Sequence, residues 1–188
     1  MDVAYRSSLL RRIRAMHSLY YDACATMTEA QVNAVTHEGA LPIAFSLVHQ
    51  VLIEDGSLLF AGGTPAKFDE HWKSRLKLSI NDHGKARTVE EMMAQHIGDY
   101  QAFLEFQRLV FEATENFVRD IEPSSLSEII VTFPYGPTLE HTFSARVGGE
   151  VGITRSDAIE SWIYQHGLRH MGEIEHARAL VGLGGMTS

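Results

Sequence analysis

The sequence predicts an all-α protein: an antiparallel four-helix bundle with a short extended or β-hairpin excursion before the last helix. Four segments repeat apolar residues at helical spacing, Gly and Pro separate them, and only one stretch alternates at the strand period. The chain of 188 residues, 45% apolar and 21% charged, is sized for one hydrophobic core. We therefore expect a single domain spanning residues 1–188.

The first two helices follow from apolar spacing and from turn residues. From about Ala4 to Met27, apolar residues share one face of an amphipathic helix. The next segment runs from Pro42, which suits the first turn of a helix, to about Phe60, before a Gly-Gly pair. This second helix is apolar on nearly all sides, which is typical of a buried helix.

The third helix is predicted to be the longest. Residues 64–87 are punctuated by Pro, Asn-Asp and Gly, and indicate a short helix or a wrapped connection. Thr88 and Glu91 then fit a capping box. From there apolar residues keep one face to Ile121, which predicts one continuous helix of about 33 residues, or roughly 50 Å.

The period changes between residues 121 and 157. Ile129–Phe133 and Leu139–Val147 alternate around a Pro-Tyr-Gly-Pro turn, which predicts a short β-hairpin. Ser156 or Asp157 would cap the last helix, whose apolar stripe continues to Gly182.

The amino-acid composition limits the binding partners and the cellular compartment that we expect for the protein. The net charge of −8 disfavours nucleic acid and anionic membrane surfaces, because both normally require a basic face. Cys24 is the single cysteine, so no internal disulfide forms, and we interpret it as a small core residue. The start does not resemble a signal peptide, and charged or polar residues interrupt the longest apolar run. We expect a cytoplasmic protein.

The sequence contains ten histidines, and they are the feature of the composition that indicates metal binding. His166 and His170 are four residues apart on the last helix, so their imidazoles project from one face and can bind one metal ion. Both interrupt an apolar stripe that faces the interior. Buried, unpaired imidazoles lose their hydrogen bonds to water and repel each other when protonated, and a metal ion removes both costs.

A metal site needs a third protein ligand. His49 on the second helix is one candidate, with a hydrogen-bonded core histidine as the alternative. His96 on the third helix is another, with a role beside a ligand or at the edge of the stripe as the alternative. The remaining histidines are interpreted as solvated surface residues: His17, His37, His71, His83, His141 and His176.

These motifs resemble the DinB-like family. The segment 166–174, His-Gly-Leu-Arg-His-Met-Gly-Glu-Ile, is similar to that family's closing signature H-x-x-x-H-x-G-Q-I, and residues 42–51 are similar to its second-helix motif with one histidine. The resemblance implies a four-helix bundle that holds one divalent metal ion, zinc or nickel, on His49, His166 and His170. Family members with assigned activities act as metal-dependent thiol transferases, isomerases and hydrolases.

The sequence departs from the family pattern at two positions. Met171 stands where arginine is frequent, and Glu173 stands where glutamine is frequent. Glu173 lies nearly on the face of His166, so it is the candidate catalytic residue: a general base, a fourth ligand, or an orienting partner for a histidine N–H. A surface glutamate is the alternative. Glu54 and Asp55 are interpreted as a solvated helix end.

The predicted function is a metal-dependent enzyme that activates water or a thiol against a small-molecule substrate, as a hydrolase or a thiol S-transferase. Tyr100, Met93 and Trp162 are expected to line its pocket. The alternative is a helical binding module with a structural metal or none. Glu-x-x-His at 173–176 lacks the second copy that a di-iron bundle requires, and Gly167 excludes the His-Glu-x-x-His of zinc proteases.

We also expect a homodimer. The second helix is apolar on nearly all sides, and the third is rich in phenylalanine, at positions 103, 106, 111 and 117. Such helices bury spare apolar surface against a second copy.

Overall fold

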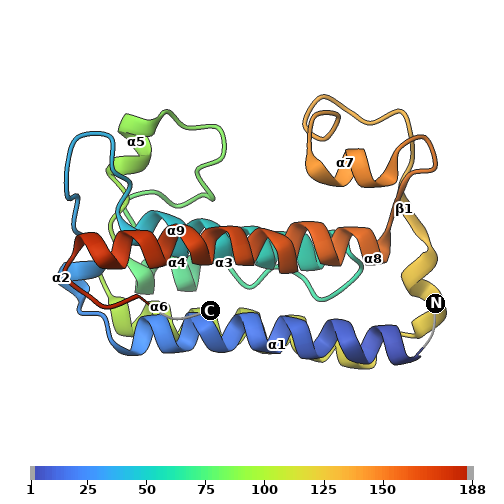
Figure 1. The fold of residues 1–188 in the computed structure, drawn as a ribbon, viewed down its shortest axis with the longest axis horizontal. Helices are drawn as coiled ribbons and strands as arrows, with labels where there is room; N and C mark the ends of the chain where they lie inside the picture. The colour runs from blue at the N-terminus through green and yellow to red at the C-terminus, as the bar shows by residue number, and fades with distance from the viewer. Residues whose placement is uncertain (1–2, 186–188) are drawn as a thin grey trace.

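The computed structural model describes residues 3–185. The chain is mostly helical, with one small antiparallel sheet of two strands among these residues (Figure 1). The main helices are α1 (Val3–Ala25), α3 (Ile43–Phe60), α6 (Tyr100–Asp120) and α9 (Gln165–Leu180). The short elements are α2 (Glu29–Val32), α4 (Glu70–Leu76), α5 (Val89–Met93), η1 (Pro123–Ser127), β1 (Ile129–Val131), α7 (Phe143–Gly148), β2 (Ile153–Thr154), α8 (Arg155–Ala158) and η2 (Ile159–Tyr164).

The four main helices lie side by side, with α3 beside α9 and α1 beside α6 (Figure 1). Side-chain contacts give their directions. Arg12 pairs with Glu160 and Tyr20 donates to the carbonyl of Gly167, so α1 and the last helix run the same way. The pairs Ser46–Glu173 and Gln50–His166 run in opposite order, so α3 and α9 are antiparallel.

The first two predicted helices are confirmed. Helix α1 buries the apolar face that the spacing predicts, and α3 begins directly after Pro42. By length and composition α3 could cross a membrane, but 67% of that segment is buried inside the protein. It is the central core helix.

The prediction of one continuous third helix is wrong. Residues 94–99 leave the helix between α5 and α6 because tertiary hydrogen bonds replace the helical ones. The Asn33 side chain binds both the N–H and the C=O of Ile97, at 2.9 and 3.0 Å. A Cβ at Gly98 would lie 2.8 Å from the Cβ of Lys77, so only glycine permits this close approach. Asp99 then caps α6.

The predicted β-hairpin is also corrected. Strand β1 forms, but it pairs with β2 rather than with residues 139–147. Those residues fold instead into a turn and α7, because the Thr142 side chain accepts a hydrogen bond from the N–H of Ala145 and caps a helix there.

The last helical run starts earlier than predicted and has three parts. Thr154, not Ser156 or Asp157, is the cap, and Asp157 completes its capping box. Between α8 and α9 the chain makes a π-helical segment, η2, whose wider turns change the direction in which later side chains point.

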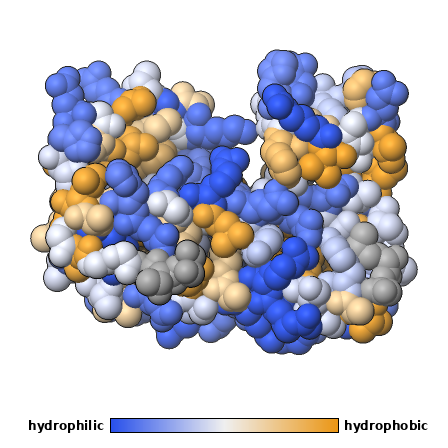
Figure 2. Space-filling view, in the orientation of Figure 1, coloured by the Kyte–Doolittle hydropathy of each residue, from blue (hydrophilic) through white to orange (hydrophobic). Residues whose placement is uncertain are grey.

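The apolar core lies between the four main helices. Phe103, Phe106 and Phe111 are at most 1% exposed, so they fill this core and offer no spare surface for the expected homodimer, which stays a prediction. Exposed apolar side chains lie on several elements, Phe60 at the end of α3 among them. Five come from β1, α7 and the loops beside them, Ile129, Phe133, Phe143, Val147 and Val151, and apolar surface is visible on the lobe at the upper right of Figure 2.

His17, Glu54 and Asp55 were predicted to be solvated, and all three are buried. His17 stacks on Phe111 and lies between two carboxylates, with Nε2 3.0 Å from Glu54 and Nδ1 2.9 Å from Glu115. Asp55 accepts hydrogen bonds from the backbone N–H groups that follow α3, at residues 67 and 68. Helical periodicity misplaced these polar residues because each finds its partner on another element.

His17 and its two carboxylate partners, Glu54 and Glu115, link α1, α3 and α6 electrostatically. Burial lowers the pKa of His17, but the charge of Glu54 and the hydrogen bonds to Glu115 and Glu54 outweigh it and raise the pKa to about 9. Arg14 pairs with the outer side of Glu115. The imidazole is therefore a buried cation at neutral pH.

Because His17 is a buried cation, we expect the free energy of unfolding to depend on pH. Because the folded pKa of His17 exceeds the unfolded value, its contribution is complete below pH 6.5 and is lost as pH rises through about 9. The shift corresponds to about 3 kcal/mol. In urea unfolding with chelator present, the free-energy difference between wild type and His17→Gln should shrink by about that amount from pH 6.5 to 9.5. A difference that does not change with pH would contradict the assignment.

Candidate metal centre

Three histidines from two antiparallel helices meet at one point. His49 comes from α3, and His166 and His170 come from α9. The Nε2 atom of His166 lies 3.2 Å from Nε2 of His49 and 3.2 Å from Nε2 of His170. One ring nitrogen of each residue lies within 4.8 Å of the other two, so this group could hold a metal ion. His170 is 7% exposed, and the other two rings are partly exposed.

The outer ring nitrogens show where the protons are. Nδ1 of His166 lies 2.7 Å from Oε1 of Gln50, Nδ1 of His170 lies 2.6 Å from a carboxylate oxygen of Glu173, and Nδ1 of His49 lies against the carbonyl oxygen of His83. All three oxygens are acceptors, so each Nδ1 carries the proton and donates it. Each Nε2 is then a bare lone pair.

These lone pairs match the donor set of a metal site. Unprotonated nitrogens cannot hydrogen-bond to one another, so their close approach is unfavourable unless a cation lies between them. In a tetrahedral zinc site with Zn–N distances of 2.0–2.1 Å, the nitrogens lie about 3.3 to 3.4 Å apart. The two separations of 3.2 Å agree with that value, and N–H groups bound to oxygen on the outer side are typical of metal-binding histidines.

The pKa values agree with neutral imidazoles. Burial lowers the pKa of His49 to about 4, although its hydrogen bond to His83 opposes the shift. Burial and the neighbouring His170 lower the pKa of His166 further. The hydrogen bond from His170 lowers the pKa of Glu173, which therefore stays a carboxylate at neutral pH.

Gly167 allows the two helices to approach at this point. A Cβ on Gly167 would lie 2.2 Å from Sδ of Met16 and 3.0 Å from Nε2 of Gln50. A side chain beside His166 would therefore displace the end of Met16 and crowd Gln50, and glycine lets α9 pack on α1 and α3 without either change. Tyr20 donates to the Gly167 carbonyl at 2.8 Å and holds the same contact from the α1 side.

Glu173 accepts hydrogen bonds from two helices. One carboxylate oxygen accepts from Nδ1 of His170 and, at 3.3 Å, from the hydroxyl of Ser46. Among the three roles expected for Glu173, this is the geometry of an orienting partner. A hollow of about 220 Å³ opens beside it, with Leu41 and His176 among its walls.

Of the remaining sequence predictions for the site, the one for the residues that line the pocket is not met, and the one for Cys24 is. His96 is exposed in the loop between α5 and α6 and is not among the three clustered histidines. Tyr100 is buried, and its hydroxyl donates to the carbonyl of Cys24, whereas Trp162 donates to Ser144. Neither side chain lines the hollow beside Glu173, nor does Met93. Cys24 is a core residue as predicted, and burial raises the pKa of its thiol to about 11.

The sequence did not predict two hydrogen-bond partners of the clustered histidines. Gln50 was not singled out, although it follows His49 directly, and His83 contributes its backbone carbonyl rather than its ring. A glutamine on the apolar face of a buried helix is the available signal for the first, because a buried amide needs polar partners. A backbone acceptor leaves no such signal.

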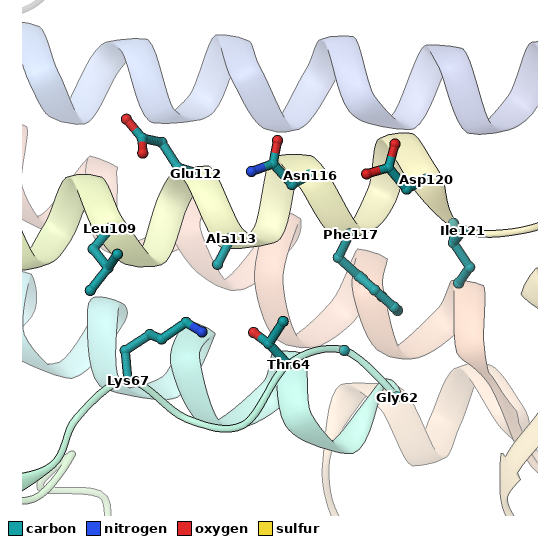
Figure 3. A pocket seen from close by; sticks show the side chains of 11 residues that line it. Gly62, Thr64, Lys67, Leu109, Glu112, Ala113, Asn116, Phe117, Asp120 and Ile121 are labelled. Atoms are coloured by element: carbon teal, nitrogen blue, oxygen red, sulfur yellow. The ribbon is translucent and has the colours of Figure 1, made fainter.

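A larger hollow of about 640 Å³ lies elsewhere, between α6 and the loop after α3 (Figure 3). Leu109 and Phe117 point toward that loop, whereas Glu112, Asn116 and Asp120 point away from it. None of the three clustered histidines lines it. It lacks the convergent polar groups of a catalytic pocket.

The comparisons with known proteins establish the fold alone. No family model matches the chain, and no curated protein matches it. Among solved structures, the chain is similar to a conserved protein from Enterococcus faecalis, with a TM-score of 0.74 and 17% sequence identity. The similarity covers 96% of this chain and 98% of that chain. The all-α class is supported, and membership in the DinB-like family stays a prediction.

The position of Glu173 leads to a prediction about metal affinity. In Glu173→Leu the N–H of His170 loses its acceptor, and the affinity for zinc should fall about 10- to 100-fold. Glu173→Gln keeps an acceptor oxygen and should stay within a few-fold of wild type. Glu175→Leu is the control, because no hydrogen bond links Glu175 to a histidine in the described chain. Competition titration with a chelator measures all four proteins, and unchanged affinity in Glu173→Leu would exclude the orienting role.

Proposed function

We propose that the protein is a metal-dependent enzyme of the DinB-like type, a four-helix bundle that holds one divalent ion, zinc or nickel, on His49, His166 and His170. The observation that carries this proposal is the set of three Nε2 lone pairs that face one point while each Nδ1 donates to an oxygen. With these protons each Nδ1–H has an oxygen acceptor, whereas the three Nε2 lone pairs have no partner until a cation binds them.

Such an ion, held by three protein ligands with a position left open, acts as a Lewis acid and lowers the pKa of a water or thiol that binds it. The residues around it supply positioning. Glu173 fixes the ring of His170, and its carboxylate borders the hollow of about 220 Å³. Ser46, which donates to the same carboxylate, lines that hollow too. None of the three clustered histidines lines this hollow, so we place the small-molecule substrate at the open position of the ion, with the hollow adjoining it through Glu173 and Ser46.

The reaction class is hydrolysis or thiol transfer, with the nucleophile supplied from outside the chain. Cys24 is buried and its pKa is raised to about 11, so it is not the thiol that reacts. The rival function, a binding module without a catalytic metal, becomes an outcome of the test below.

The proposal predicts that each of the three histidines is required for metal binding. Protein purified without a histidine tag, loaded with zinc or nickel and desalted, should retain about one ion per chain. His49→Ala and His166→Ala should lose it, because two nitrogen ligands are too few for a stable site. His96→Ala is the matched control and should retain the ion. Elemental analysis measures the content, and circular dichroism confirms folding.

The same proteins test catalysis. Metal-loaded wild type should cleave an activated ester or accelerate addition of a thiol to an electrophilic acceptor, and both chelation and His49→Ala should abolish the turnover. A stoichiometric ion retained in His49→Ala would contradict the three-histidine site. A folded wild type that binds no metal would favour the binding module.

A further inference from the structure

A chain of hydrogen-bonded polar groups, three of them fully buried, runs from the histidine cluster to Glu115 on α6. His166 donates from Nδ1 to Oε1 of Gln50 at 2.7 Å, and Nε2 of Gln50 donates to Glu54 at 3.0 Å. The other oxygen of Glu54 lies 3.0 Å from His17, whose second nitrogen lies 2.9 Å from Glu115. The chain crosses four helices, α9, α3, α1 and α6.

The hydrogen bonds of this chain run in one direction only. The Glu54 carboxylate accepts and cannot donate, so Gln50 must present its NH₂ group to Glu54. The carbonyl oxygen of the same amide then faces His166, which must carry its proton on Nδ1. The charge of Glu54 is in turn balanced by His17. The buried ion pair thus determines the tautomer of His166 through one amide.

Because these groups are buried, they have no alternative hydrogen-bond partners. Gln50, Glu54 and His17 are all 0% exposed, so water is not available as a substitute partner. The backbone of α9 also packs on the amide, since a Cβ at Gly167 would lie 3.0 Å from Nε2 of Gln50. The other two histidines have different partners: a backbone carbonyl for His49, and for His170 the Glu173 carboxylate, whose side chain is 54% exposed.

We propose that Gln50 and Glu54 are positioning residues of the metal centre, which hold His166 in the Nδ1–H tautomer with Nε2 directed at His49 and His170. This inference rests on the proposed function. It adds that metal affinity depends on two residues that touch no metal, and that the buried pair of Glu54 with His17 serves the site as well as the fold.

The first test needs no metal and no variant. Long-range nitrogen–proton correlation spectra of the metal-free protein report the tautomer of each histidine. We expect His166 in the Nδ1–H form, whereas free neutral imidazole side chains favour Nε2–H. An Nε2–H tautomer at His166 in the folded, metal-free protein would overturn the proposal.

The second test removes the amide. Gln50→Met keeps the size of the side chain but leaves Nδ1 of His166 without an acceptor, so the affinity for cobalt(II) should fall about 10- to 100-fold and the visible spectrum of the bound ion should change. Gln107→Met is the matched control, because Gln107 is also 0% exposed and its amide lies near Cys24 rather than a histidine of the cluster. It should bind cobalt as wild type does.

Glu54→Met provides a second variant in case Gln50→Met does not fold. It removes the acceptor of the Gln50 NH₂ group, so the amide is no longer held with its oxygen toward His166, and both the cobalt affinity and the Nδ1–H signal of His166 should fall. Circular dichroism verifies folding in each protein. Wild-type affinity in folded Gln50→Met or in folded Glu54→Met would overturn the proposal.

The two proposals fail in different ways. A wild type that shows the Nδ1–H tautomer but binds no cobalt would refute the metal-dependent function and support the positioning of His166. A wild type and a Gln50→Met variant that bind one cobalt ion equally well would support the metal site and refute the role of Gln50.

Discussion

Three unprotonated ring nitrogens that face one another are the constraint on which this structure depends. They repel unless a cation lies between them, and the protein holds them in place by binding each opposite N–H to an oxygen. Gly167 lies beside this cluster where α9 packs on α1 and α3, and a Cβ there would displace the end of Met16 and crowd Gln50.

The fold contributes a second set of charges to the same region. His17 bridges Glu54 and Glu115 and so links three helices, at a desolvation cost that an apolar core would not carry. Buried ion pairs are weak evidence for stability alone. Here one carboxylate of the pair also orients the Gln50 amide toward the site. A role in positioning His166 gives a physical reason for placing polar groups in this core.

Much of the fold and the histidine cluster could be predicted from the sequence. The predictions that were wrong share one physical cause. Local periodicity predicted α1 and α3, and the interior position of His166 and His170 predicted the cluster, because these features depend on which face is apolar. The break at Gly98 and the burial of His17 depend on partners distant in sequence, Asn33 and Lys77 for the first and Glu54 and Glu115 for the second. One-dimensional spacing does not contain those contacts.

The most direct test is a crystal structure of the protein loaded with zinc or nickel, with data collected at the absorption edge of the metal. The account predicts one strong anomalous peak per chain, bonded to Nε2 of His49, His166 and His170 at about 2.0 to 2.1 Å for zinc, with Gln50 and Glu173 still accepting from the outer nitrogens. A peak elsewhere, or well-ordered histidines with no peak between them, would contradict it.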